Sequence, residues 1–278
     1  MKVSIVTINY NNVLGLRRTI ESVVNQTCKD YEYIIIDGGS TDGSVDIIKQ
    51  YENKITYWVS EKDRGIYNAM NKGIAVAKGD YCNFLNSGDC YFDSNVIYNF
   101  KGHCKGEDLC IGNAYFVTSG GKHVGTWYSP KEYSLKKLFK VNPNHQSAFI
   151  KLSLMRKYRY DESLKIVSDM KFFLQALIIE NCSYKKLPFN IVYYDGGGIS
   201  TTNIELYKRE KELVYLQLFP KRIYIDYYIS SSCERYYYEL INYISPYPCA
   251  IKIASIFIFL ISIPYRFRNK FCREKTIS

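Results

Sequence analysis

The sequence predicts an α/β fold in which helices flank a mostly parallel central sheet. Along the first hundred residues, short β-branched runs alternate with segments whose apolar residues recur at helical spacing. Glycine-rich polar turns follow several of the expected strands. Hydrophobic residues make up 47% of the 278 residues and charged residues 23%, which is enough apolar material for a large core. Alternating strands and helices favour parallel strands whose carboxyl ends share one edge of the sheet.

Each element is expected from its own local pattern. Strands are predicted over 3–8, 33–36, 55–59, 81–85 and 147–151. Helices are predicted over 16–24, 45–51, 66–77, 169–179 and 204–219, where apolar residues repeat every three or four positions. The stretch 101–145 is less regular, with a turn at 120–121, and 195–198 is expected to be a flexible glycine loop.

The positive charge is concentrated in the second part of the chain. Residues 1–100 carry 10 Lys and Arg against 12 Asp and Glu, whereas the remaining residues carry 27 against 15, which gives the net charge of +10. Such a basic surface suits phosphorylated ligands, nucleic acid or an anionic membrane. The nine cysteines are odd in number and form no Cys-x-x-Cys pair, and Met1-Lys2 leads directly into a strand. We therefore expect a reduced, cytoplasmic chain.

The end of the chain has a different composition. Residues 250–264 read AIKIASIFIFLISIP, and five basic residues follow within 266–275. This apolar run is shorter than the roughly 20 residues needed to span a bilayer. It could be a buried helix, but the basic flank favours an in-plane membrane helix that meets anionic headgroups. The 28 tyrosines suit a membrane interface and also suit an ordinary core.

Several carboxylates follow expected strands. Residues 33–44 read YIIIDGGSTDGS, so Asp37 ends a strand before two glycines that let backbone approach a ligand. Asp42, Asp63 and Asp89 fall at the same edge. Each alone could cap a turn or helix, but together they suggest a polar, nucleotide-like ligand and a hard divalent cation such as Mg²⁺ or Mn²⁺.

An ordered set of motifs over residues 1–179 resembles the family-2 glycosyltransferases, which have the GT-A fold. The motifs are VSIVTINYNN, TIESVVNQT, YIIIDGGSTDGS, SEKDRGIYNAMNKGIAVAKGDY, FLNSGD, HQSAFI and DESLKIVSDMKFFLQAL. The resemblance implies a GT-A domain over 1–200, with a Rossmann-like nucleotide-sugar half over 1–100 and an acceptor half over 101–200. From the residue pattern, 201–278 is expected to be a C-terminal helical extension, whose apolar and basic segment is 250–275.

The resemblance also implies where the nucleotide sugar is bound. The family grips the nucleotide at the end of the first strand, contacts the base with the Asp of the second strand, and places an Asp-Arg-Gly stretch against the donor. The matching positions are Thr7, Asn9, Tyr10, Asp37, Ser40, Asp42, Asp63, Arg64 and Gly65. Arg64 could instead be a solvated surface arginine.

The metal motif departs from the family pattern. Family members commonly read Asp-x-Asp-Asp after the fourth strand, whereas this chain reads Asn86-Ser87-Gly88-Asp89. Asp89 is therefore the implied ligand of a divalent cation that arrives with the diphosphate. Asn86 offers a neutral oxygen or a hydrogen bond to the sugar.

The family's catalytic base maps to Asp169. A carboxylate there would take the proton of the acceptor hydroxyl as the nucleotide leaves. Ser168-Asp169 also has the pattern of a helix N-cap, so a structural role is the alternative. His145-Gln146 resembles the family's acceptor-side His-Gln pair.

The sequence is thus interpreted as an inverting glycosyltransferase of the hexosyltransferase type. It would move one sugar, from a UDP-sugar, to a hydroxyl of a lipid-linked saccharide in cell-surface polysaccharide synthesis. The enzyme would lie peripherally at the inner face of the membrane. A catalytically weak sugar-nucleotide binder and a basic nucleic-acid-binding protein are the alternatives. The second is disfavoured because no nucleic-acid-binding motif is present.

Overall fold

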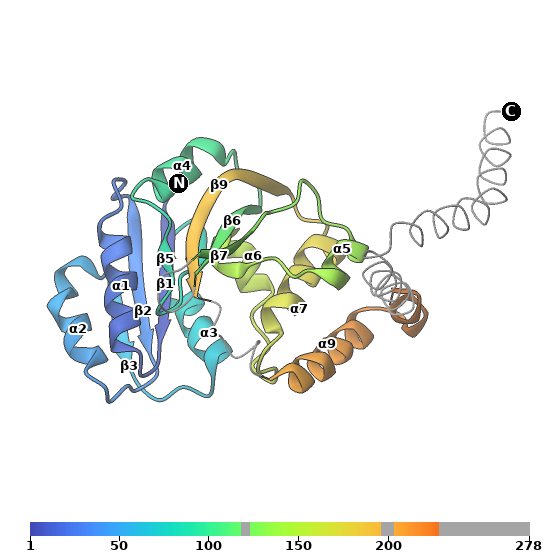
Figure 1. Ribbon diagram of the computed structural model, residues 1–278, viewed down its shortest axis with the longest axis horizontal. Helices are drawn as coiled ribbons and strands as arrows, with labels where there is room; N and C mark the ends of the chain where they lie inside the picture. Colours follow the sequence, from blue (N-terminus) through green and yellow to red (C-terminus); the bar gives the residue numbers. More distant parts are fainter. Residues whose placement is uncertain (118–122, 196–202, 228–278) are drawn as a thin grey trace, which may run out of the picture. The chain divides into compact units, whose positions relative to one another are not determined.

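The computed structural model describes residues 1–117, 123–195 and 203–227. It divides into two compact units, Met1–Phe219 and Pro220–Ser278. The first unit is an α/β fold built on one sheet, as Figure 1 shows, and the predicted fold class is confirmed. The apolar and basic segment 250–275 lies outside the described residues. Within those residues, no helix is both long and apolar enough to cross a membrane.

The first half of the sheet is parallel. Its strands are β1 (Val3–Asn9), β2 (Tyr31–Asp37), β3 (Tyr57–Ser60) and β4 (Tyr81–Phe84). They lie in the order β3-β2-β1-β4, with Asn9 beside Asp37 and Asp37 beside Ser60. Every residue of β1 is buried, as expected for a central strand with helices on both faces. The carboxyl ends of these strands therefore share one edge, where the predicted carboxylates fall.

The second half extends this sheet with antiparallel neighbours. β8 (Ala148–Lys151) pairs antiparallel with β4 and with β6 (Leu109–Val117), and β6 pairs parallel with β9 (Tyr184–Asp195). Two short strands, β5 (Cys90–Tyr91) and β7 (His123–Trp127), add to β9 and β6. The sheet thus continues beyond the parallel strands in the order β4-β8-β6-β9-β5.

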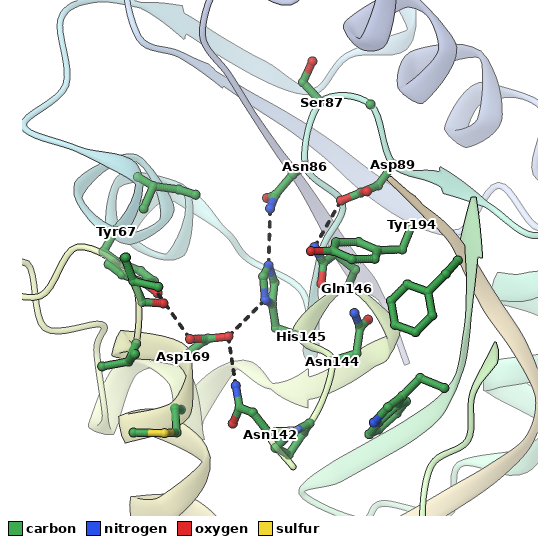
Figure 2. Close-up of a pocket in the computed structure, with 18 of the residues that line it drawn as sticks. Tyr67, Asn86, Ser87, Asp89, Asn142, Asn144, His145, Gln146, Asp169 and Tyr194 are labelled. Atoms are coloured by element: carbon green, nitrogen blue, oxygen red, sulfur yellow. Dashed lines mark hydrogen bonds and ion pairs between the residues drawn. The ribbon is translucent and has the colours of Figure 1, made fainter. Parts of the chain in front are cut away.

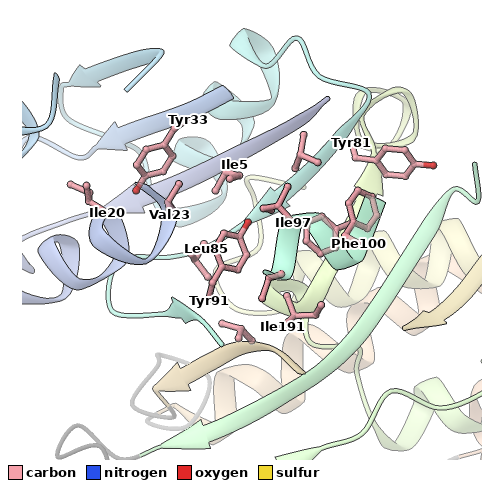
Figure 3. Close-up of a cluster of buried hydrophobic side chains, with 14 of the residues drawn as sticks. Ile5, Ile20, Val23, Tyr33, Tyr81, Leu85, Tyr91, Ile97, Phe100 and Ile191 are labelled. Atoms are coloured by element: carbon pink, nitrogen blue, oxygen red, sulfur yellow. The ribbon is translucent and has the colours of Figure 1, made fainter. Parts of the chain in front are cut away.

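Helices cover both faces of the sheet. The elements are α1 (Val13–Val24), α2 (Ser44–Gln50), α3 (Ile66–Val76), α4 (Val96–His103), α5 (Leu135–Lys140), α6 (Leu152–Lys157), α7 (Ser168–Leu174) and α9 (Ile204–Leu218). One face of the sheet packs with α1, α2 and α4 into the cluster of Figure 3, where Tyr33 lies near Ile20 and Val23. At the other end of the cluster Phe100 of α4 packs against Tyr81. On the other face α3 comes so close that a Cβ at Gly73 would lie 2.5 Å from Val6.

Two features fix the position of α7. The stretch before it is held by Glu210 of α9, whose buried carboxylate accepts the backbone N–H groups of Lys165, Ile166 and Val167 at 2.8–3.3 Å. At its other end α7 passes into a π-helix, Gln175–Ile179. The helix predicted from 204 onward therefore belongs to the same compact unit as the sheet.

Candidate functional site

Two cavities open where the parallel strands end. The first, here called the strand-end cavity, has a volume of about 730 Å³ and is lined by residues that follow β1, β2 and β3 and by the start of α3. The second, here called the Asp169 cavity, has a volume of about 830 Å³ and lies between the loop after β4 and helix α7. Asn12, Ile66, Asn86 and Ser87 line both cavities. The two cavities therefore share a wall.

The strand-end cavity offers an aromatic ring, open backbone and one carboxylate. The Tyr10 side chain is 69% exposed and lines the cavity together with Gly38, Gly39 and Asp63. A Cβ at Gly38 would lie 3.1 Å from the Tyr10 ring and 3.2 Å from an oxygen of Asp63, so only glycine lets these groups approach so closely. Asp63 is held by Lys72, whose ammonium lies 2.6 Å from Asp63 and 2.7 Å from Glu61.

Asp37 organises this cavity from beneath. Its fully buried carboxylate accepts hydrogen bonds from the Asn9 amide at 2.7 Å and from the hydroxyls of Ser40 and Ser60 at 2.6 Å each. It also accepts the backbone N–H groups of Gly39 and Ser40. Burial raises the pKa of Asp37, but these hydrogen bonds outweigh burial and leave the pKa lowered. Asp37 therefore holds the cavity-lining Asn9 and Gly39 and does not itself line the cavity.

Asp169 lies on the wall of the second cavity (Figure 2). One carboxylate oxygen is 3.2 Å from the Tyr67 hydroxyl. The other accepts from the Asn142 amide at 3.2 Å and lies 3.4 Å from Nδ1 of His145. The N-cap of α7 is Val167, which makes no side-chain capping bond. Since Asp169 is in the first turn with its side chain turned to these partners, it does not act as the N-cap.

His145 connects Asp169 with the shared wall. Its Nε2 lies 3.3 Å from the Asn86 amide nitrogen, and Figure 2 shows the imidazole between Asn86 and Asp169. In the tautomer with its ring proton on Nδ1, the imidazole would accept the Asn86 N–H at Nε2 and direct its own N–H at Asp169. The amide oxygen of Asn86 is buried and has no hydrogen-bond partner in the described part of the chain.

Asp89 lies on the same cavity, next to the shared wall. Its side chain is buried, and one carboxylate oxygen accepts from the Gln146 amide at 3.2 Å. The turn is held by Thr19, whose hydroxyl donates to the Asp89 carbonyl at 2.7 Å and accepts the Gly88 N–H at 2.9 Å. The backbone at Asp89 is therefore fixed independently of the carboxylate.

An aromatic wall faces the Asp169 cavity from the second half of the sheet. Phe116 of β6, Trp127 of β7 and Tyr194 of β9 all line it, and each is half-buried. The rings of Phe116 and Tyr194 meet edge to face with centroids 5.3 Å apart. Such partly exposed rings on neighbouring strands can receive the apolar face of a ligand.

Comparisons with known proteins agree with this architecture. The family model described as "Glycosyl transferase family 2" matches residues 4–163. The chain belongs to glycosyltransferase family 2. An uncharacterized glycosyltransferase of Mycobacterium tuberculosis is 35% identical over 204 residues, which are 72% of this chain and 77% of the relative. A PGL/p-HBAD biosynthesis glycosyltransferase of Mycobacterium bovis is 26% identical over 215 residues, which are 73% and 80% of the two chains.

Solved structures share the fold. S. aureus TarS 1-349 in complex with UDP-GlcNAc has a TM-score of 0.59 at 18% identity, covering 78% of this chain and 67% of that one. The chain spans 39% of a longer TarS chain. The mannosyltransferase PcManGT of Pyrobaculum calidifontis, in complex with GDP-Man and Mn²⁺, has a TM-score of 0.58 at 12% identity, covering 96% and 83%. At these identities the likeness shows the fold alone.

The structure places the site residues predicted from the sequence in four groups. Asn9, Tyr10, Asp63, Gly65 and Asn86 line the strand-end cavity, and Asn86, Asp89 and Asp169 line the second. Asp37 and Ser40 lie beneath the first cavity as its hydrogen-bonded support.

The remaining three predicted residues also line neither cavity and do not support one from beneath. Thr7 lies two residues before Asn9 in β1, where its side chain is buried and its hydroxyl is 3.0 Å from the Tyr33 hydroxyl. Asp42 accepts the N–H of Val13 at 2.8 Å and also bonds Ser44, so it connects the starts of α1 and α2. Arg64 has a side chain that is 81% exposed, and it pairs with Glu162 at 3.0 Å.

Sequence reasoning did not single out Tyr67, Asn142 or the aromatic wall. Tyr67 lies inside the motif SEKDRGIYNAMNKGIAVAKGDY, so the motif carried a signal for it. Asn142 comes from a stretch of sequence without a regular pattern. The aromatic wall comes from strands that are far apart in the sequence, such as β6 and β9. For these residues only the fold brings the side chains together.

Proposed function

We propose that this family-2 glycosyltransferase is an inverting enzyme that moves one sugar from a nucleotide sugar to a hydroxyl of a saccharide acceptor. The strand-end cavity would hold the donor, and the Asp169 cavity would hold the acceptor. The observation that carries the proposal is the placement of the Asp169 carboxylate on a cavity that meets the strand-end cavity at Asn86 and Ser87. A base, an acceptor and an anomeric carbon can then meet at one wall.

The donor proposed is a UDP-sugar. The exposed Tyr10 ring can stack on a base, and the backbone at Gly38 and Gly39 can approach a nucleotide closely. Asp63 offers a hydrogen-bond acceptor to the ribose or base. Structures that share this fold hold UDP-GlcNAc or GDP-Man, which supports a nucleotide-sugar donor.

In the proposed reaction, Asp169 takes the proton of the acceptor hydroxyl as its oxygen attacks the anomeric carbon. The bond from that carbon to the nucleotide diphosphate breaks on the opposite side, so the configuration inverts. Asn142 and His145 hold the carboxylate in one orientation. Preorganisation of this kind is needed because a small displacement of the base slows the step.

The donor atoms next to the shared wall suit a hard divalent cation. The Asp89 carboxylate and the unpaired amide oxygen of Asn86 are both oxygen ligands of the kind that Mg²⁺ and Mn²⁺ prefer. Among the described residues no group of three close acidic, His or Cys ligands forms at this wall, so the diphosphate would have to complete the site. A cation there would neutralise charge on the leaving diphosphate.

The aromatic wall supports a saccharide acceptor, because pyranose rings present an apolar C–H face to rings such as Trp127 and Phe116. A lipid-linked acceptor in cell-surface polysaccharide synthesis is the finer proposal. It rests on the apolar and basic segment 250–275, which would bind the enzyme peripherally to the inner face of the membrane.

A donor screen tests the proposal. UDP, GDP and dTDP release would be measured from matching nucleotide sugars with Mn²⁺ or Mg²⁺, with and without saccharide acceptors. Acceptor-stimulated UDP release that EDTA abolishes is expected. Nucleotide-sugar binding without any turnover would favour the weak-binder alternative, and salt-sensitive binding to single strands would favour the nucleic-acid alternative.

A further inference from the structure

Two buried thiols and a carboxylate meet at the link between α4 and β6, away from both cavities. One ligand atom each from Cys104, Glu107 and Cys110 lies within 4.8 Å of the other two. Over residues 1–117, 123–195 and 203–227, no other group of three His, Cys, Asp or Glu side chains comes this close. Cys104 is 6% exposed and Cys110 is fully buried. The proposed transferase activity gives these groups no role.

Local structure brings the three side chains together. Cys104 is the C-cap residue of α4, and Cys110 is the second residue of β6. Between them Gly106 has φ +107, a left-handed conformation that reverses the chain and favours glycine. The turn returns Glu107 toward Cys110, and one Glu107 oxygen accepts the Lys105 N–H at 2.7 Å. The ligand spacing is therefore set by a turn that does not depend on a metal.

We propose that Cys104, Glu107 and Cys110 bind a structural zinc ion. Tetrahedral zinc with Zn–S bonds of about 2.3 Å and Zn–O bonds of about 2.0 Å requires ligand separations of roughly 3.5–3.8 Å. The Cys110 sulfur lies 4.0 Å from Oε2 of Glu107, and the 4.8 Å limit holds for the whole set. The Cys110–Glu107 separation would shorten by about 0.5 Å and the other separations by at most about 1.3 Å to close the site, and a water would complete the fourth position.

The surrounding charge fits a divalent ion with two thiolates. Zinc would displace one proton from each thiol to solvent, leaving two thiolates and one carboxylate against the metal's two positive charges. The remaining negative charge is met by the Lys185 ammonium, 3.3 Å from Oε1 of Glu107. Burial raises the pKa of Glu107, but its hydrogen bond from the Lys105 N–H and its contact with Lys185 outweigh burial and leave that pKa lowered. Because both thiols must lose a proton to bind zinc, zinc affinity should increase with pH.

The position of the cluster indicates a structural role. The Tyr81 hydroxyl donates to the Glu107 carbonyl at 2.7 Å and accepts from the Cys104 thiol. Tyr81 is the first residue of β4, whereas Asp89 follows the other end of that strand. Thiolates select a soft ion such as zinc, and the oxygen ligands at Asp89 suit a hard one. The two metals would therefore occupy different ends of β4.

The test is a Co²⁺ titration of the full-length chain, reduced and stripped of metal. Thiolate ligands give a Co²⁺ charge-transfer band that oxygen ligands at Asp89 cannot give. We expect this band to form, to disappear on addition of Zn²⁺, and to be lost in Cys104→Ser and Cys110→Ser. Loss of an outer-shell partner alone costs about 10–100-fold in metal affinity, so Glu107→Gln should weaken Zn²⁺ binding by at least about tenfold. Zn²⁺ should also raise the melting temperature.

Cys182→Ser is the matched control, because Cys182 is a partly buried thiol outside the cluster, and its band should be unchanged. No thiolate band in the wild-type chain, or a band unchanged in both cluster cysteine variants, would overturn the proposal. If either serine variant fails to fold, the Glu107→Gln affinity decides, and wild-type affinity there refutes the site. A Cys104–Cys110 disulfide whose reduction yields no Co²⁺ site would identify the pair as a redox couple instead.

Discussion

Replacing Asp169 with Asn separates a catalytic base from a structural residue. Asn keeps the size of the side chain and one oxygen that can accept from Tyr67, but it cannot take up a proton. Because the N-cap of α7 is Val167 and makes no side-chain capping bond, the change removes no helix cap. We therefore expect Asp169→Asn to fold and to bind donor normally while turnover falls.

The size of the loss follows from the composition of the cavity. Its described lining holds two carboxylates, Asp169 and Asp89, and Asp89 already accepts from Gln146. No second carboxylate stands beside Asp169 among these lining residues, and the imidazole of His145 is engaged with Asn86, so most of the contribution of general-base catalysis should disappear. That contribution is about 10²- to 10⁴-fold, equivalent to about 2.7–5.4 kcal/mol in activation free energy. The same variant also weakens the hydrogen bonds that the Asp169 carboxylate accepts, which should lower the free energy of unfolding by about 1–3 kcal/mol.

The assay compares single-turnover sugar transfer, donor affinity by calorimetry and the melting temperature. Turnover should fall at least about a hundredfold with donor affinity unchanged. Asp161→Asn is the control, since Asp161 forms an ion pair with Lys171 at 2.6 Å and lines neither cavity. This control should lose some stability and keep its turnover.

Near-normal turnover in Asp169→Asn would remove Asp169 from the mechanism. Loss of donor affinity in the same variant would place the residue on the donor side. A decline in turnover matched by the Asp161→Asn control would show that the helix position, and not the carboxylate, is what matters.

Three further predictions test other parts of the site. Asp89→Ala should abolish transfer and sharply weaken metal-dependent UDP binding, measured by calorimetry with Mn²⁺ or EDTA. The fold should survive because Thr19 holds the turn through backbone groups. Unchanged UDP affinity and an unchanged response to EDTA would contradict the metal role. Asp37→Asn should weaken donor binding more than turnover, because Asn9 and Gly39 lose their support. The pKa of Asp37 is lowered in the folded chain, so the carboxylate contributes stability above the unfolded pKa of about 3.9, and this contribution is lost as pH falls through the folded pKa. The difference in unfolding free energy between wild type and Asp37→Asn, measured by urea unfolding, should therefore become smaller in acid. A difference that does not change with pH would refute the charge argument. Removing the residues after Ser245 should release the enzyme from anionic liposomes. Apolar burial at about 25 cal/mol per Å² and about 1 kcal/mol for each basic residue near the surface together give a membrane-binding free energy of several kcal/mol. An insoluble truncated chain would instead indicate that the segment is a core helix.

The first half of the fold could be predicted because its signals are local. Each strand from β1 to β3 is followed by its own turn and helix, and the predicted strand 3–8 differs from Val3–Asn9 by one residue. β9 was not predicted because Pro188 interrupts the strand pattern. In the structure, pairing with β6 passes from Lys186 directly to Asn190, and this irregularity accommodates the proline. Such a pairing depends on a distant strand and leaves no local mark.

The location of the candidate site at the strand ends could also be predicted from local signals, but the role of each carboxylate could not. A carboxylate just after a strand has the same local sequence whether it faces a ligand or caps a helix. Asp63 and Asp42 illustrate this, because one lines a cavity and the other bonds the N–H at the start of α1. Partners such as Asn142 contact Asp169 only because α7 and the segment after α5 are brought together by the fold.

The π-helix after α7 makes that part of the chain tolerant of one change in length. A π-turn holds one residue more than an α-turn, so Gln175–Ile179 contains an extra residue relative to regular helix. Deleting one residue there would let the segment become α-helical while α7 and β9 keep their phase. The same deletion within Ser168–Leu174 would rotate the following residues by about 100° on a helix of 3.6 residues per turn. Length variation in this enzyme should therefore be accepted at the π-turn and rejected one turn earlier.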